Sequence, residues 1–347
     1  MLLRFIFCSL LLIFLLCNLA ISEELSIVIV GDMMFGAELA QIMDREGSLA
    51  PFAGVIDTLK SADITFGVLE GVISERGEKD LNKAVTYRSK PSTARGLSNA
   101  GFDIISLATP HILDYGKEGF LDTLEFLSWY GIKYVGAGRN LREAKQPIII
   151  DAKGTKIAFL AYYRGFQFDK TFFAKEDQIG PAFPVFEDLE KDVSNAKAQS
   201  DFVIAFIHWG ARTNGSEVTE RQRLYAQKLI DSGVDFVIGQ KLNILQGVEI
   251  YNGKPIFYSL GDFIYGTYAK KEPYGFMLRL IISDKKLIRT EVIPISISDA
   301  ISGSFLPEHI EGQKVQDAIN VLNKLSEEFG TTIIIKDNFG VIEQKEN

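Results

Sequence analysis

Two of the three histidines and several carboxylates follow apolar runs that are typical of buried strands. His111 and His208 each come after such a run, and Asp32 and Glu70 follow two earlier runs. Because the carboxyl ends of parallel strands meet at one edge of a sheet, we expect these four side chains to converge. Carboxylates and imidazoles are ligands for Mn, Fe or Zn ions, which polarise phosphoryl or carbonyl oxygens and activate water.

Further polar residues occupy the same kind of position. Asp114 follows His111, Gln240 and Asn243 follow a later run, and Asp262 follows the last. Taken singly, an Asp after a strand is more often a helix cap or a turn residue, and a lone His at a strand end is usually structural. Only the coincidence of several such residues favours a metal site.

The elements that would position these residues are short apolar runs alternating with amphipathic helices, the pattern of an α/β sandwich. Strands are predicted at 27–30, 64–68, 104–107, 156–162, 202–207, 236–238 and 331–335. Helices are predicted around 52–59 and at 116–130, 217–232 and 315–325. Asn252-Gly253 predicts a hairpin, because Asn-Gly supplies the positive φ angles of a type I′ turn, and a second hairpin is expected near Asp284. The chain after Asn338 shows little pattern that would predict a helix or a strand.

The composition is that of a globular protein. The chain has 347 residues, 47% of them hydrophobic, and a formal net charge of -8. Proteins that grip nucleic acid need clustered Lys and Arg, so the charge argues against a nucleic-acid partner. No linker or internal repeat divides the sequence.

The first 22 residues have the pattern of a secretory signal peptide. Arg4 precedes an apolar run over 5–16, and Ala20-Ile21-Ser22 offers a small-x-small cleavage site. An uncleaved membrane anchor or a lipoprotein remains an alternative, although Leu16 stands where a lipobox has a small residue. We expect an exported protein, periplasmic or on the cell surface.

The cysteines lie inside this leader. Both of them, Cys8 and Cys17, precede residue 23, so the remaining chain has no thiol for a disulfide, a zinc site or a nucleophile.

Several different short motifs follow one another between residue 27 and residue 266. They are VGDMM at 30–34, VLEG at 68–71, AGFD at 100–103, HILDYG at 111–116, GAGRN at 136–140, IHWG at 207–210, QGVE at 246–249 and PIFYSLGDF at 255–263. With these motifs the chain resembles the bacterial CapA/PgsA-type family of capsule and poly-γ-glutamate synthesis proteins. That family is similar to calcineurin-like metallophosphatases. The resemblance therefore implies a four-layer α/β/β/α sandwich and a role in making, exporting or processing an anionic envelope polymer.

The sequence departs from the family pattern at the metal-site motifs. Where the family has Gly-His-His-Pro-His, this chain has Gln240, Lys241 and Asn243 in place of the histidines. Pro110 precedes His111 where the family has an Asn, and Arg212 stands where the family has a Glu. The surviving donors would bind a binuclear metal centre weakly, because amide oxygens are poor ligands for such ions.

The predicted site follows from what remains. The candidate metal ligands are Asp32, Glu70, His111, His208, Gln240 and Asn243, and Asp262 could supply a further carboxylate. His111 and Asp114 are the predicted catalytic residues. Arg212 and Lys241 are predicted to bind an anion in place of a cation, with solvated loop residues as the alternative.

The aromatic-rich stretch 162–183, which bears Arg164, is expected either to pack as its own cluster or to form a lid over the strand ends. We predict a signal peptide at 1–22, a CapA-like metallophosphatase-fold domain at 23–300 and a C-terminal helix and strand extension at 301–347.

Three functions remain open, and the third of them is that of a purely structural envelope protein. The first is an exported protein that supports synthesis, export or processing of an anionic envelope polymer, with weakened or lost metal-dependent catalysis. Its partners would be that polymer or the machinery that makes it, with membrane association as an option. The second is an active metal-dependent hydrolase of phosphoester or γ-glutamyl bonds. The cofactor is unknown: a divalent Mn, Fe or Zn ion, or none.

Overall fold

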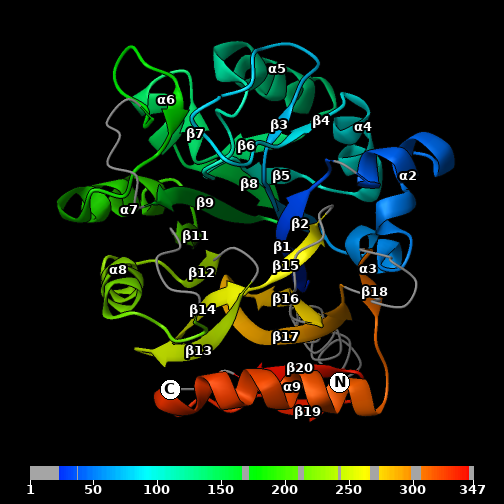
Figure 1. Ribbon diagram of the computed structural model, residues 1–347. Helices are drawn as coiled ribbons and strands as arrows, with labels where there is room; N and C mark the ends of the chain where they lie inside the picture. The colour runs from blue at the N-terminus through cyan, green and yellow to red at the C-terminus, as the bar shows by residue number, and fades with distance from the viewer. Residues whose placement is uncertain are drawn as a thin grey trace, which may run out of the picture.

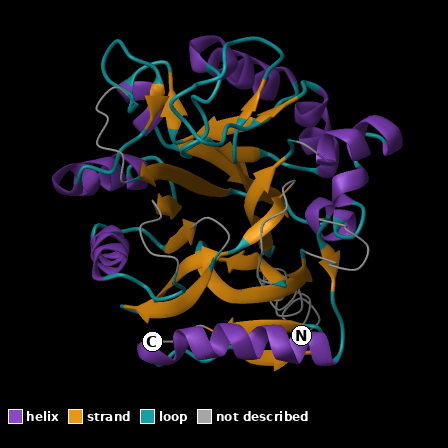
Figure 2. Cartoon of the chain, viewed as in Figure 1, coloured by secondary structure: helices purple, strands orange, loops and turns teal. Residues whose placement is uncertain are grey.

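A computed structural model of the chain describes residues 23–36, 38–165, 172–209, 215–240, 244–265, 273–297 and 306–343. Two large β-sheets dominate it (Figures 1 and 2). The predicted signal peptide, residues 1–22, lies outside the described residues. Within the part of the chain that the structure describes, no helix combines the length and apolar character needed to cross a bilayer.

The first sheet has the order β19-β20-β17-β16-β1-β2-β5-β6, with β15 beside β1 and β18 beside β17. Its strands are β1 (Leu25–Met34), β2 (Ile64–Leu69), β5 (Ile104–Ser106), β6 (Lys133–Val135), β15 (Asp262–Tyr265), β16 (Tyr274–Ser283), β17 (Lys286–Ser296), β18 (Glu308–His309), β19 (Ile334–Lys336) and β20 (Phe339–Glu343). The strands β1, β2, β5 and β6 are parallel. The sheet continues beyond β1 through β16, β17, β20 and β19, each antiparallel to its neighbour.

The second sheet has the order β13-β14-β12-β11-β9-β8. Its strands are β8 (Ile148–Ala152), β9 (Thr155–Arg164), β11 (Phe202–Trp209), β12 (Phe236–Gln240), β13 (Leu245–Tyr251) and β14 (Lys254–Leu260). Its four central strands are parallel and its two edge strands antiparallel. Two small pairs join β3 (Val72–Ile73) to β4 (Arg88–Ser89), and β7 (Ala137–Gly138) to β10 (Gly180–Pro181).

Helices cover the outer faces of this pair of sheets (Figure 1). They are α2 (Glu38–Glu46), α3 (Ile56–Lys60), α4 (Ser92–Ala100), α5 (Gly116–Trp129), α6 (Leu141–Lys145), α7 (Leu189–Lys197), α8 (Glu220–Asp231) and α9 (Gln313–Ser326). Buried residues of α7 and α8 form an apolar cluster with the second sheet. Residues of α4, α5 and α9 join the main core.

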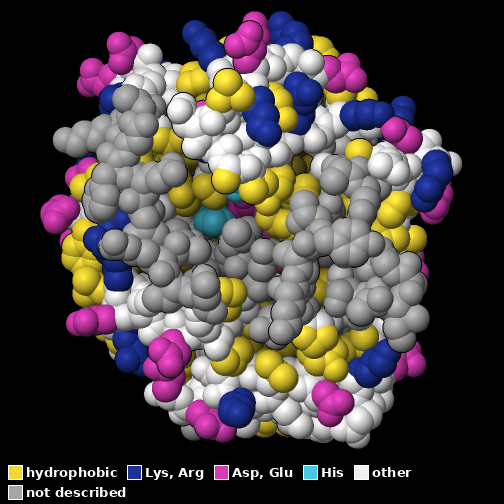
Figure 3. Space-filling model, viewed as in Figure 1, with side chains coloured by type: hydrophobic (Ala, Val, Ile, Leu, Met, Phe, Trp, Pro, Cys, Tyr) yellow, Lys and Arg dark blue, Asp and Glu magenta, His cyan; other side chains and the backbone are white. Residues whose placement is uncertain are grey.

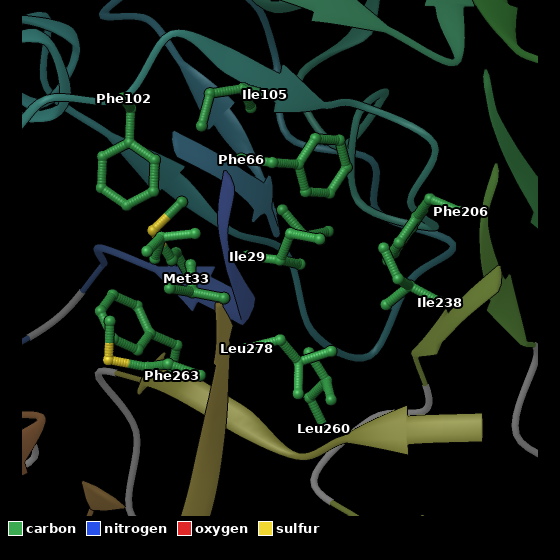
Figure 4. Packing of buried hydrophobic residues seen from close by; sticks show 14 of the residues in the cluster. Ile29, Met33, Phe66, Phe102, Ile105, Phe206, Ile238, Leu260, Phe263 and Leu278 are labelled. Carbon is green, nitrogen blue, oxygen red and sulfur yellow. The ribbon is translucent and has the colours of Figure 1, made fainter. Parts of the chain in front are cut away.

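The two sheets pack face to face through apolar side chains. The ring of Phe66 on β2 stacks on that of Phe159 on β9, with centroids 5.7 Å apart, and lies 5.8 Å from the ring of Phe206 on β11. Figure 4 shows the same layer, with Ile29 and Ile238 among its members. The layers are therefore helix, sheet, sheet and helix, which confirms the expected α/β/β/α sandwich.

Both predicted hairpins are present. Asn252 and Gly253 have φ angles of 49° and 74°, and Asp284 and Lys285 have φ angles of 48° and 64°. The first pair joins β13 to β14 and the second joins β16 to β17.

The structure corrects the sequence prediction around residues 52–59 and at the end of the chain. The apolar pattern around 52–59 is divided between a 3₁₀ turn, Ala50–Phe52, and the short helix α3, although it buries the expected face. Residues Phe339–Glu343, for which no strand was predicted, form β20 by pairing with β17. The C-terminal segment thus adds strands to the first sheet. The predicted boundary at residue 300 falls outside the described residues and stays a prediction.

The chain passes from the second sheet to the first at Gly261, between β14 and β15. Gly261 has a φ of 73°, a left-handed conformation that favours glycine. On the neighbouring strand, a Cβ at Gly31 would lie 2.1 Å from the carbonyl oxygen of Gly261. This close approach aligns Asp32 with Asp262.

The substitution Gly31→Ala should therefore destabilise the protein. The added methyl group meets backbone, and overpacking of this kind costs about 1–3 kcal/mol. Urea denaturation measures the loss. Gly215→Ala is the matched control, because its Cβ would meet nothing closer than 3.9 Å. Equal stability of the two variants would contradict the close approach.

Candidate metal centre at the strand ends

Three buried side chains from both sheets converge at the carboxyl ends of the parallel strands. Asp32 lies near the end of β1, Glu70 directly follows β2, and His208 lies near the end of β11. One ligand atom from each of them lies within 4.8 Å of the others. His208 Nε2 is 2.7 Å from Glu70 Oε1 and 3.9 Å from Asp32 Oδ2.

Five of the six polar side-chain atoms of these three residues lack hydrogen-bond partners. Asp32 Oδ1, both carboxylate oxygens of Glu70 and both ring nitrogens of His208 are buried without one. His208 Nε2 and Glu70 Oε1 are close, yet their geometry is not that of a hydrogen bond. Buried polar atoms are normally satisfied, so atoms that are not require another partner. A cation shared by the three side chains is such a partner.

The electrostatics of the cluster point the same way. Burial raises the pKa of Glu70 to about 7, and the charges of Asp114 and Asp262 act in the same direction. Burial raises the pKa of Asp32 well above its usual value, and the charge of Glu70 adds to this. Burial also lowers the pKa of His208. Each shift shows that the charged forms are poorly solvated here, and a bound divalent ion would stabilise the carboxylates. The residues present therefore fit a metal ion.

Gln240, at the end of β12, holds Asp32 in place. Its Nε2 donates to Asp32 Oδ2 at 3.0 Å and to the Gly261 carbonyl oxygen at 2.8 Å. The side chain thus acts as a donor toward the cluster, and its Oε1 is buried without a partner. An imidazole at this position could have offered a lone pair to an ion, whereas the amide N–H groups cannot.

A second group of side chains lies beside the three ligands. His111 Nδ1 is 2.7 Å from Asp114 Oδ2, and the backbone N–H of Tyr87 donates to the same oxygen at 2.7 Å. Lys83 Nζ lies 2.5 Å from the other carboxylate oxygen, Asp114 Oδ1. The ring of Tyr87 covers that of His111 at 4.3 Å between centroids, and its hydroxyl accepts from Tyr265 at 2.9 Å. The result is a His-Asp pair whose carboxylate is held from several sides.

The predicted residues can now be placed. The structure brings Asp32, Glu70 and His208 together, with Gln240 against Asp32. His111 lies near enough for its charge to lower the pKa of Glu70, but its Nδ1 is directed at Asp114 rather than into the three-ligand cluster. Three further predicted site residues, Arg212, Lys241 and Asn243, lie outside the described residues, so their roles stay predictions.

Sequence reasoning missed Lys83 and Tyr87. Both come from the loop between β3 and β4, which has no apolar periodicity and no recognisable motif. Their contacts with Asp114 depend on how this loop folds over α5 and could not be found from spacing. The aromatic stretch 162–183 is packed where it is described, with the ring of Tyr163 5.8 Å from those of Phe172 and Phe173.

Figure 3 shows histidine and acidic side chains at the base of a depression near the centre of one face, with apolar side chains along part of its rim.

Comparison with known proteins identifies the relatives of this chain. The family described as bacterial capsule synthesis protein PGA_cap matches residues 26–267. The capsule biosynthesis protein CapA of Bacillus anthracis is 28% identical over 285 residues, which cover 80% of this chain and 69% of that protein. The PGA biosynthesis protein CapA of Bacillus subtilis is 29% identical over 282 residues, covering 80% and 73%.

Solved structures with a similar arrangement are more distant. NAD nucleotidase of Haemophilus influenzae has a TM-score of 0.49 and 15% identity, over 87% of this chain and 63% of that chain. The calcineurin-like phosphoesterase YfkN of Bacillus subtilis has a TM-score of 0.42 and 16% identity, over 77% and 88%. These TM-scores are below 0.5, and the fold assignment rests on the layers and sheets described above.

Metal binding should stabilise the protein through Glu70. Adding Mn²⁺ at 100 times its dissociation constant should raise the free energy of unfolding by about 2.7 kcal/mol, seen as a higher melting temperature. Glu70→Gln should abolish most of this shift, because it removes an anionic ligand. It should also stabilise the metal-free protein, because a poorly solvated charge is lost.

The control is Glu249→Gln, which alters a buried carboxylate that accepts from Tyr258 and Gln227 outside the cluster. If Mn²⁺ raised the melting temperature of Glu70→Gln as much as that of the wild type, the three-ligand site would be ruled out.

Lys83 should matter for stability as well. Its side chain is 14% exposed and that of Asp114 is fully buried, so Lys83→Met would leave a buried carboxylate without its cation. Breaking a buried pair costs about 3–5 kcal/mol. The matched control is Lys90→Met, whose pair with Asp44 is half exposed and should cost less than about 1 kcal/mol. Chemical denaturation compares the two, and equal losses would contradict a buried Lys83–Asp114 pair.

Proposed function

The chain belongs to the bacterial capsule synthesis protein family PGA_cap, and we propose that it is an exported accessory protein for an anionic envelope polymer. In this proposal its strand-end site holds one divalent ion and retains only weak hydrolytic activity. The single observation that carries the proposal is the cluster of Asp32, Glu70 and His208, in which five of the six polar side-chain atoms are buried without hydrogen-bond partners.

The ligand set favours one ion over two. Within the described residues, Asp32, Glu70 and His208 are the only group of His, Cys, Asp and Glu residues close enough to hold a metal ion. Gln240 turns its amide nitrogen toward Asp32, so it does not add an anionic or imidazole donor. Two-ion hydrolytic sites clamp both the attacking and the leaving oxygen, and a site with one ion loses half of that clamp.

A divalent ion in this cluster would polarise a phosphoryl or carbonyl oxygen. Proton transfer would be carried out by His111 and Asp114. The Asp114 carboxylate accepts from Lys83 and the Tyr87 amide, and in this proposal His111 Nδ1 donates the hydrogen that joins the pair. His111 Nε2 would then take a proton, and the pair with Asp114 would stabilise the imidazolium that forms.

The role in polymer synthesis is supported by the relatives. The matching proteins of Bacillus anthracis and Bacillus subtilis are named for capsule or PGA biosynthesis. Export is supported by the leader pattern of residues 1–22, with cleavage or retention as a membrane anchor both compatible with it. The partners would be the acidic polymer or the enzymes that make it.

The second candidate, an efficient hydrolase of phosphoester or γ-glutamyl bonds, is favoured by the intact His111–Asp114 pair. A protein without catalysis has no evident need for an oriented imidazole.

Hydrolysis of p-nitrophenyl phosphate and of poly-γ-glutamate, with and without Mn²⁺, tests the proposal. We expect slow, Mn²⁺-dependent turnover that His111→Ala lowers by about 100-fold or more, the usual share of a general acid–base group. Lys90→Met, on the exposed surface, is the control and should be unchanged.

Turnover above about 10 s⁻¹, the median for enzymes, would favour the efficient hydrolase instead. In the native host, Glu70→Gln should reduce the amount of surface polymer. Unchanged polymer after deletion of the whole gene would overturn the accessory role.

A further inference from the structure

Arg164 is a buried cation at the end of β9 that the metal centre does not use. It is 7% exposed. In register, Tyr163 pairs with His208, and Arg164 pairs with Trp209. Side chains alternate along a strand, so Tyr163 faces the other sheet while Arg164 faces the helices. The ring of Tyr163 lies 5.6 Å from that of His208, which places Arg164 one residue away from a direct neighbour of the metal centre.

Two aromatic rings hold the guanidinium group. Its central carbon lies 4.9 Å from the ring centroid of Phe183 and 5.2 Å from that of Tyr225 on α8. Nη1 donates to the Gly165 carbonyl oxygen at 3.2 Å. Nε is buried without a hydrogen-bond partner, and no ion pair of Arg164 with a carboxylate is found among the described residues.

A buried charge of this kind calls for an anion. Cations are seldom buried without a counter-ion, because desolvation costs several kcal/mol. Cation–π contacts offset part of that cost through the faces of the guanidinium group, and they leave its in-plane N–H groups for an acceptor. The guanidinium edge formed by these N–H groups binds a carboxylate or a phosphate through two parallel hydrogen bonds.

The same protein shows how that edge is used elsewhere. Arg289 directs Nε and Nη2 at one oxygen of Glu291, at 3.0 and 2.8 Å. Arg76 directs Nε at Asp122 Oδ2 at 3.1 Å. In both cases Nε is satisfied by a carboxylate, which is the partner that Arg164 Nε lacks.

We propose that Arg164 is an anion subsite that binds one carboxylate of an acidic polymer chain at the strand ends, on the helix side of the second sheet. The identification of the ligand as a polycarboxylate rests on the proposed function, whereas the subsite itself rests on the contacts of Arg164. An extended chain crossing the strand ends would meet the metal centre on one side of β9 and this subsite on the other.

Binding can be followed through Trp209, the register partner of Arg164. In a Trp129→Phe background, Trp209 is the sole tryptophan and is buried. Its fluorescence is titrated at fixed salt with poly-γ-glutamate and, separately, with inorganic phosphate, both in the presence of EDTA. We expect poly-γ-glutamate to bind, and Arg164→Gln to weaken its binding by about 10- to 100-fold, the effect of losing hydrogen bonds to a charged group. Arg164→Lys should lose most of that affinity too, because it keeps the charge but not the planar edge.

The matched control is Arg223→Gln. Arg223 also lies over an aromatic ring, that of Phe329 at 4.7 Å, but it has Glu249 as a counter-ion at 3.8 Å. Its substitution should leave binding unchanged. Equal affinity of the wild type and Arg164→Gln would overturn the subsite. Tighter binding of phosphate than of the polycarboxylate would overturn the assignment of its ligand.

Thermal melting separates a binding role from a structural one. Without ligand, Arg164→Gln should melt at or above the wild-type temperature, because a buried charge without a counter-ion is removed, and only the wild type should be stabilised by poly-γ-glutamate. Unfolding of Arg164→Gln without ligand would show a structural role and overturn the proposal. The Mn²⁺ shift should persist in Arg164→Gln, so failure of the subsite is distinguishable from failure of the metal centre.

Discussion

The rest of the site depends on one constraint: two carboxylates are buried beside a histidine, and few hydrogen-bond donors surround them. Asp32 and Glu70 carry raised pKa values because burial disfavours their charged forms. Gln240 satisfies one oxygen of Asp32, while both oxygens of Glu70 have no hydrogen-bond partner. Such an arrangement destabilises an empty fold and is compensated when a cation binds. The cluster is better suited to holding an ion than to stabilising the protein.

Close backbone packing between the two sheets holds the residues of this cluster in place. The chain crosses from one sheet to the other at Gly261, whose carbonyl oxygen leaves no room for a side chain at Gly31 and accepts from Gln240. The same contacts therefore fix Asp32 from β1 against the end of β12. Lys83 neutralises Asp114, which lets a further carboxylate lie close to Glu70 and orient His111.

Much of this could be predicted from the sequence, for physical reasons. Strands buried on both faces are continuous apolar runs, so the central strands and the polar residues at their ends were visible, including Asp32, Glu70 and His208. The contacts of Lys83, Tyr87 and Arg164 were not, because they depend on loops and on long-range packing that leave no periodic pattern. Strand β20 was missed for the same reason: its pairing with β17 comes from tertiary structure. The preference of Gln240 for donating to Asp32 also required the coordinates.

The most direct test of the central claim is anomalous diffraction at the manganese edge from a crystal grown with Mn²⁺. One ion held by Asp32, Glu70 and His208, with Gln240 still donating to Asp32, is the result that a reduced single-ion site predicts. Two well-occupied ions bridged by a carboxylate would contradict it, and so would a cluster that takes up no ion and satisfies its carboxylates with water.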